Sequence, residues 1–251
     1  MSTLFPSCLR RHRTLPALVL LAVLAALAGC TAAPKSGYGL APADRAPPAA
    51  AEPPAVPADG RGPYLALVAR MQEQGLWYAS LAHLDALEQR HGAGDDSTAL
   101  RADALRQTGR AADSAALYRR LTQSSTDAAA GWRGLGLLAA ADGDFNQAAE
   151  HLDKARQRLP TDALLLSDLG YALLRAGRLD DARMPLMQAR ELRPDHPKVA
   201  ANLALYLLVR QQAAPAETLM AEQRMTGPVR AGIRAEARRL RADGGSASTS
   251  P

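Results

Sequence analysis

The sequence of 251 residues contains few cysteines, few aromatic residues and no pattern typical of a β-strand. Cys8 and Cys30 are its two cysteines, which is too few for a disulfide framework or a cysteine-rich metal site. Aromatic side chains account for 4% of the residues. The sequence also lacks a run rich in Val, Ile and Thr that alternates with polar residues between turns. These absences argue against a disulfide-stapled fold and against a β-sheet.

The usual signatures of catalysis are lacking as well. A Gly-x-Ser-x-Gly elbow does not occur, and Asp142 and Asp144 are not followed by the further ligands of a calcium loop. Gly131, Gly134 and Gly136 resemble a phosphate-binding loop, but they follow no predicted strand. The histidines form no metal-binding motif. We therefore predict that the protein is not an enzyme and holds neither a metal nor a cofactor.

The first 29 residues have the organisation of a targeting segment. Arg10, Arg11 and Arg13 form a basic region, and residues 15–28 are an apolar run of 14 residues, shorter than the about 20 that span a membrane. The run ends in Leu-Ala-Gly followed by Cys30, which resembles the lipobox of bacterial lipoproteins. The resemblance implies that residues 1–29 are removed as a signal peptide and that Cys30 receives a lipid. A plain secretory leader and a twin-arginine signal are the alternatives.

Removal of this leader changes the charge balance of the chain. The whole sequence has 30 basic and 25 acidic residues, and no acidic residue precedes Cys30. Without the three arginines of the leader, 27 basic residues remain and the net charge is +2, which argues against a nucleic-acid partner. Thr31, rather than Asp, follows the cysteine. By analogy with lipoprotein sorting in Gram-negative bacteria, this favours a lipid anchor on the periplasmic face of the outer membrane.

Residues 30–60 contain the lipidated cysteine and a segment rich in Pro, Ala and Gly. Proline removes hydrogen-bond donors and favours the polyproline II conformation, which rises about 3.1 Å per residue, so the segment could extend about 90 Å. We predict a disordered, semi-stiff tether that lets the following residues act at a distance from the membrane.

A period of 34 residues organises residues 61–230. Glycine recurs at Gly75, Gly109, Gly143 and Gly177. Larger side chains recur at Leu84, Tyr118, Leu152, Leu186 and Met220. Small or medium side chains recur at Val68, Ala102, Gly136, Gly170 and Ala204, and at Ser80, Ser114, Ala148, Ala182 and Ala216. Several columns at one period define five units: 61–94, 95–128, 129–162, 163–196 and 197–230.

The third unit indicates how each unit folds. Gly143 can adopt the left-handed conformation that ends a helix, and Asp144 can cap the next helix with Gln147 completing a capping-box-like pair. Pro160 stops that second helix. The unit resembles a tetratricopeptide repeat at seven positions: Trp132, Leu135, Gly136, Phe145, Ala148, Ala155 and Pro160. Four side chains are expected to fill the space between its helices: Trp132, Leu135, Leu152 and Ala155.

The resemblance implies an all-α fold, an α-solenoid of about five 34-residue helix-turn-helix repeats with a carboxy-terminal capping helix. Two positions depart from the pattern. Pro185 falls inside the second helix of the fourth unit, where it is expected to kink or loosen that helix. In the fifth unit Gln211 and Gln212 replace the turn glycine.

A last helix is predicted from Val229 to about Ala242. Val229, Ile233, Ala237 and Leu240 fall on one helical stripe that can cover the exposed apolar end of a solenoid. Arginines occupy the rest of the helix, so an acidic partner or anionic lipid is the alternative reading of this segment. Residues 231–251 are accordingly assigned to the end of the capping helix and a flexible tail.

The resemblance further implies that the first helix of each unit lines the concave side, where relatives bind peptides. We predict partner-binding residues at Arg106, Arg133, Tyr171, Arg175, Lys198 and Asn202. Other residues placed on this face are Asp103, Ser167, Leu174, Ala201, Leu205 and Leu208. The mixture of apolar, cationic and amide groups is typical of a peptide-binding groove, although an ordinary solvated face is the alternative.

Within this class the chain resembles the tetratricopeptide-repeat lipoproteins of Flp/Tad pilus systems, in its leader, its spacer, its array and the run of residues 197–219. That resemblance implies a periplasmic scaffold or assembly factor that binds envelope proteins and helps an outer-membrane secretin to assemble or localise. Alternatives are a pilotin of another secretion or type IV pilus system, a non-catalytic subunit or regulator of a cell-wall enzyme, and a small-ligand carrier.

Overall fold

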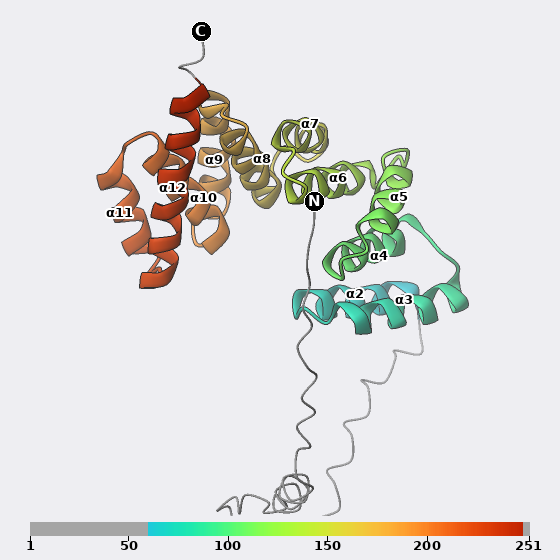
Figure 1. Ribbon diagram of the computed structural model, residues 1–251. Helices are drawn as coiled ribbons and strands as arrows, with labels where there is room; N and C mark the ends of the chain where they lie inside the picture. The colour runs from blue at the N-terminus through green and yellow to red at the C-terminus, as the bar shows by residue number, and fades with distance from the viewer. Residues whose placement is uncertain (1–59, 248–251) are drawn as a thin grey trace, which may run out of the picture. The chain divides into compact units, whose positions relative to one another are not determined.

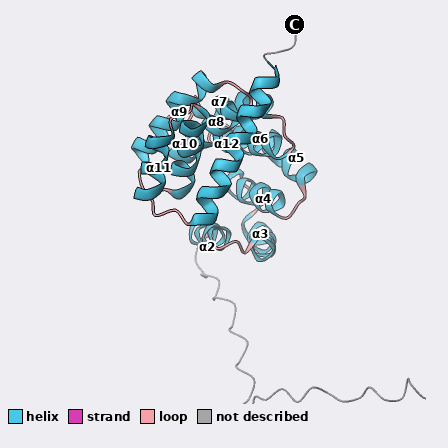
Figure 2. Cartoon of the chain, turned by 60° about the vertical axis from the view of Figure 1, so that its left-hand side comes forward, coloured by secondary structure: helices cyan, strands magenta, loops and turns pink. Residues whose placement is uncertain are grey.

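The computed structural model describes residues 60–247, and of residues 244–247 it describes the backbone alone. Within this range the chain forms eleven α-helices and no strand (Figure 2). The helices follow one another in packed pairs, so the predicted all-α solenoid is confirmed. The predicted signal peptide, the lipid attachment at Cys30 and the tether lie outside the described residues.

Each of the five units contains one helix pair. The first helices are α2 (Arg61–Glu73), α4 (Asp95–Gln107), α6 (Ala128–Ala141), α8 (Ala163–Arg175) and α10 (Pro197–Val209). The second helices are α3 (Trp77–His91), α5 (Ala111–Leu121), α7 (Phe145–Arg156), α9 (Leu179–Leu192) and α11 (Ala213–Glu222). The chain ends in α12 (Gly227–Ala247).

Neighbouring units pack through both of their helices. Each second helix lies against the first helix of the next unit, as α5 does against α6 and α7 against α8 (Figure 1). The first helices also contact one another in sequence, from α2 through α4, α6 and α8 to α10. Side chains on the free face of these helices therefore share one surface, here named the first-helix surface.

The columns of the 34-residue period interlock in the core. The larger members, Leu84, Tyr118, Leu152, Leu186 and Met220, are all buried, and so are the small residues of the other columns. The spacing of the helices depends on the small members. A Cβ atom added at Gly136 would lie 2.7 Å from Cγ of Leu152, and one added at Gly170 would overlap Leu186. Small residues of the first helix thus make room for large residues of the second.

The turns between paired helices use the left-handed conformation. Gly75, Gly109, Gly143 and Gly177 have φ angles of 76°, 81°, 84° and 77°, as the sequence predicts. Asp144 caps α7 by accepting a hydrogen bond of 2.9 Å from the backbone nitrogen of Gln147. In the fifth unit Gln211 occupies the equivalent turn position with a φ angle of 62°.

We expect Gln211→Gly to raise the free energy of unfolding by about 0.5–1 kcal/mol. A left-handed conformation costs an L-residue about 1–2 kcal/mol, and the greater entropy of glycine in the unfolded chain offsets part of that gain. Urea denaturation followed by circular dichroism measures the change. The reciprocal substitution Gly177→Gln should destabilise the equivalent turn of the fourth unit, and a loss of stability in Gln211→Gly would contradict the strain argument.

Two expectations about helix interiors need correction. Trp132 and Leu135 are only half-buried, whereas Leu152 and Ala155 are buried as expected. The indole of Trp132 covers the edge of the α6–α7 pair, with its centroid 5.4 Å from the imidazole of His151. Helix α9 continues through the buried Pro185 to its end at Leu192.

The last helix is longer than predicted. It begins at Gly227, two residues before Val229, because Pro228 is tolerated in a first turn, where its missing N–H has no intrahelical acceptor. It continues to Ala247 through Gly244 and Gly245, where a flexible tail was expected. Glycine weakens a helix but does not forbid it. The stripe is also shorter than predicted, because Val229 is exposed while Ala237 is buried.

Candidate partner-binding surface

The six predicted partner-binding residues all lie on first helices. Arg106 is on α4, Arg133 on α6, Tyr171 and Arg175 on α8, and Lys198 and Asn202 on α10. Because these helices contact one another in order, the structure brings most of the six into shared clusters.

A buried carboxylate that the sequence did not single out joins three units. The side chain of Asp168 is 5% exposed and lies between two cations. Its Oδ1 is 2.5 Å from Nζ of Lys198, and its Oδ2 is 3.4 Å from Nη2 of Arg133. Arg133 also reaches Asp162, which caps α8 by accepting hydrogen bonds from two backbone nitrogens. Asp168 thus links α6, α8 and α10 through charge.

An amide bridge lies beside this ion cluster. Nδ2 of Asn202 donates to Oγ of Ser167 at 2.9 Å and to the backbone oxygen of Ser167 at 3.3 Å. Ser167 is completely buried, so it supports the surface rather than forming part of it as expected. Asp168 and Asn202 share the same place in the 34-residue period. That shared position is the signal by which the sequence could have identified Asp168.

Arg175 is held in an aromatic setting. Its guanidinium carbon lies 4.1 Å from the ring centroid of Phe145, within the range of a cation–π interaction. Its Nη1 donates to the hydroxyl of Tyr171 at 2.8 Å. The Phe145 and Tyr171 rings meet edge to face at 6.2 Å and 85°. The same Nη1 is 3.2 Å from Oε1 of Glu236, which belongs to α12.

Arg106 belongs to a polar cluster in the second unit. The hydroxyl of Tyr118 donates to Oδ1 of Asp103 at 2.6 Å, and Arg106 lies 3.4 Å from both groups. Burial alone would lower the pKa of Arg106, but the hydrogen bond with Tyr118 and the charge of Asp103 outweigh it and raise that pKa above its usual value. Burial and the same carboxylate raise the pKa of Tyr118, so its hydroxyl stays protonated and donates.

A hollow of about 310 Å³ joins this cluster to the third unit. Asp103, Arg106, Arg133 and Asp162 all line it. Arg106 and Arg133 therefore face one hollow in which two carboxylates balance two cations. The hollow can offer hydrogen-bond donors and acceptors to an extended chain, and its net charge is close to zero.

The apolar part of the expected groove is not accessible. Leu174, Leu205 and Leu208 were expected on the surface, but the structure buries all three. The cations that remain each face a carboxylate: Arg106 faces Asp103, Arg133 faces Asp162 and Asp168, Lys198 faces Asp168, and Arg175 faces Glu236. The surface is therefore polar and internally neutralised.

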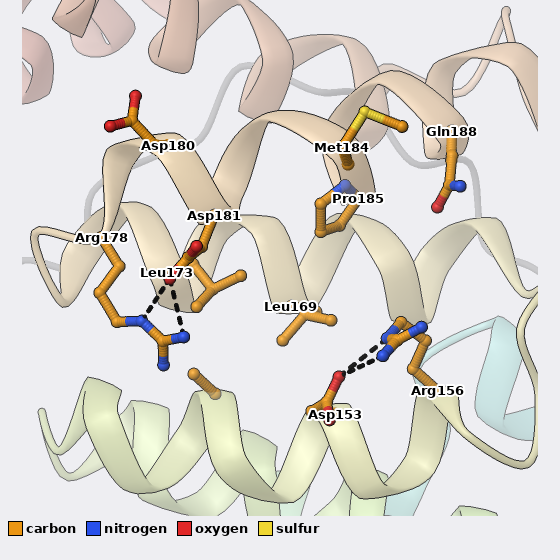
Figure 3. A pocket seen from close by; sticks show the side chains of 11 residues that line it. Asp153, Arg156, Leu169, Leu173, Arg178, Asp180, Asp181, Met184, Pro185 and Gln188 are labelled. Atoms are coloured by element: carbon orange, nitrogen blue, oxygen red, sulfur yellow. Dashed lines mark hydrogen bonds and ion pairs between the residues drawn. The ribbon is translucent and has the colours of Figure 1, made fainter.

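A second hollow, of about 420 Å³, lies among α7, α8 and α9 (Figure 3). Leu169 forms part of its floor, and ion pairs lie towards its two ends, one between Asp153 and Arg156 at 2.7 Å and one between Arg178 and Asp181 at 2.8 Å. None of the predicted partner-binding residues lines this hollow. Its charged groups are paired within single helix turns, as on an ordinary solvated surface.

Two searches of residues 60–247 gave no further type of site. No cluster of three or more His, Cys, Asp or Glu side chains in this range is arranged to hold a metal ion. Of the helices in the same range, none combines the length and the apolar character needed to cross a bilayer.

Comparison with known proteins agrees with this geometry. Residues 139–184 match the tetratricopeptide repeat family. The structure is similar to that of TTC0263, a thermophilic TPR protein from Thermus thermophilus, with a TM-score of 0.58 and 19% identity over 72% of this chain and 98% of that one. It is also similar to MamA from Desulfovibrio magneticus RS-1, with a TM-score of 0.50 and 15% identity over 65% of this chain and 92% of that one.

A search of curated protein sequences found no match. At the identities of the structural neighbours, the likeness concerns the fold alone. The described residues therefore have the fold of a tetratricopeptide-repeat solenoid, a fold that is typically non-catalytic and that mediates interactions between proteins.

Proposed function

We propose that this protein is a non-catalytic scaffold that binds a segment of another envelope protein on the first-helix surface. The observation that carries the proposal is the alignment of Arg133, Asp168 and Lys198 across three successive units. Asn202 adds an amide beside them. A guanidinium has five donors and an ammonium has three, so each cation keeps donors for a bound backbone after pairing with the carboxylate.

The proposal extends to the setting in which the scaffold works. The lipobox-like sequence before Cys30 supports a lipid anchor, and Thr31 supports the outer membrane as its location. The resemblance to the lipoproteins of Flp/Tad pilus systems supports a role in pilus biogenesis, with an outer-membrane secretin as the partner. In this proposal the lipid holds the array near the membrane while the surface binds the secretin during assembly or localisation.

Deletion of the gene is the first test, and we expect the deletion strain to lose Flp-type pili. Reintroduction of the wild-type gene should restore pili. A Cys30→Ser version should leave the protein in the soluble periplasmic fraction and restore pili poorly. Normal pili in the deletion strain would overturn the assignment to this pathway.

Site-specific photocrosslinking tests the surface itself. A photoreactive residue at Ala201, which is half-buried on α10, should crosslink to the secretin, identified by mass spectrometry. The matched control places the same residue at Gln188, which is exposed on the second helix α9. Equal crosslinking from both positions, or crosslinking from Gln188 alone, would show that the first-helix surface is not the binding site.

A further inference from the structure

The last helix does not continue the repeat. In the 34-residue period, the small residue that packs against the second helix would fall at position 238, and Arg238 there is exposed. In the earlier units, α4, α6 and α8 each pack mainly against the second helix of the preceding unit. By contrast, α12 packs mainly against the first helix α10 (Figures 1 and 2). It is therefore shifted from the place of a sixth repeat towards the first-helix surface.

Comparison of equivalent positions shows what α12 covers. At the last position of the first helix, Gln107 and Ala141 are exposed, whereas Val209 of α10 is buried. One turn earlier, Tyr171 is half-exposed, whereas the equivalent Leu205 is buried. Leu205 and Val209 belong to the same apolar cluster as three side chains of α12: Ile233, Ala237 and Leu240. The helix therefore lies over the fifth-unit end of the first-helix surface.

Charge also places α12 on the predicted binding residues. Glu236 reaches across to Arg175 on α8 at 3.2 Å. On the side of α11, Arg234 donates two hydrogen bonds to the carboxylate of Glu217, at 2.6 and 2.7 Å. An acidic group of the chain itself thus occupies the cation that the sequence assigns to partner binding.

The attachment of α12 is limited. Ala237 is its one fully buried apolar side chain among residues 227–243, and it contributes only a methyl group. Ile233 and Leu240 are partly buried, and Val229 is 47% exposed. Oε1 of Glu236 is buried close to Arg175 but makes no hydrogen bond of good geometry. A helix held by so little buried apolar area can leave its site at a modest cost in free energy.

We propose that α12 is an internal ligand of the first-helix surface, and that the partner segment is an amphipathic helix that displaces it. The inference rests on the proposed function and specifies the chemistry of the partner. The segment carries the pattern of α12: apolar residues at i and i+7, an acidic residue at i+3 and a small residue at i+4, as in Ile233, Glu236, Ala237 and Leu240. Its acidic residue takes over Arg175 when α12 leaves.

The test uses a fluorescent peptide of residues 227–247 added to the full-length protein in detergent. The wild-type protein should bind the peptide weakly, because its own α12 fills the site. Ile233→Asp with Leu240→Asp should release the internal helix and tighten peptide binding by about tenfold or more. Val229→Asp is the matched control, because Val229 is on the same helix but exposed, and it should bind the peptide as weakly as wild type.

A charge exchange identifies where the peptide binds. In the released variant, a peptide carrying Glu236→Arg should bind about tenfold less tightly, and Arg175→Glu in the protein should restore its binding. If the folded released variant binds the peptide no better than wild type, or if the charge exchange gives no rescue, the proposal is wrong. A wild-type dimer in which α12 pairs with Arg175 of a second copy would also overturn it; light scattering at increasing concentration detects such a dimer.

Hydrogen exchange on the unmodified full-length protein gives a second measurement in case the released variant does not fold. Backbone amides in the middle of α12 should exchange at least about tenfold faster than those of α10, and exchange as slow as that of α10 would contradict displacement. These tests do not depend on pili. Peptide binding with normal pili in the deletion strain would reject the proposed pathway alone, and lost pili without peptide binding would reject the displacement alone.

Discussion

Replacement of Gly131 by alanine is expected to destabilise the protein by about 2–3 kcal/mol, although alanine ordinarily stabilises a helix by about 1 kcal/mol relative to glycine. Gly131 lies in the first turn of α6, where the third unit crosses the end of α5. A Cβ atom there would lie 2.7 Å from the backbone nitrogen of Thr122 and 2.7 Å from the backbone oxygen of Tyr118. Backbone atoms cannot rotate away as a side chain can, so the two helices must separate.

Thermal and urea denaturation of the full-length protein measure this effect. The control is Gly232→Ala in α12, because an added Cβ atom at Gly232 meets no atom within 4 Å. Gly232→Ala should leave the stability unchanged or raise it by up to about 1 kcal/mol through helix propensity. A Gly131→Ala protein as stable as wild type would show that α5 and α6 do not approach as closely as described.

Removal of both cations around Asp168 is expected to cost about 2–4 kcal/mol of folding free energy. In the double variant Arg133→Ala, Lys198→Ala, the buried carboxylate keeps its charge and loses the two groups that compensate it. An uncompensated charge in a buried site costs more than the ion pairs contribute as a net gain. Each single variant should cost less, because one cation remains.

A thermodynamic cycle separates this charge effect from lost packing. Asp168→Asn removes the charge at nearly constant volume, and the same two alanine substitutions should cost much less in that background. The comparison pair is Arg178→Ala, whose partner Asp181 is more than half exposed, so that the change should stay below about 0.5 kcal/mol. If the double alanine variant costs as much in the Asp168→Asn background as in the wild-type background, the buried charge is not the cause.

The interlocking of the units was predictable because one period governs both partners of each contact. Gly136 and Leu152 belong to different columns, and every unit repeats the same pairing of a small residue with a larger one. A left-handed turn likewise needs glycine, so Gly143 marks the end of α6 in the sequence. The site residues stay predictions. Their places on the first helices followed from the period, but their pairing did not.

Asp168 shows why the pairing was missed. Its two cations are 35 and 30 residues away, Arg133 in the preceding unit and Lys198 in the next. A period of 34 residues fixes which helix face a side chain occupies. It does not fix which rotamer a long side chain adopts, nor which of several carboxylates a given arginine reaches.

The sequence by itself determined the helix pairs, their order and the faces that pack together, because these depend on side-chain size at a fixed spacing along the chain. Only the tertiary structure decided which predicted surface residues are accessible. Leu205 and Val209 are buried because α12 lies over α10, and α12 carries no repeat pattern that would announce its place. The position of a helix outside the period depends on the sum of weak contacts, such as that of Glu236 with Arg175, which exist only once the array has folded.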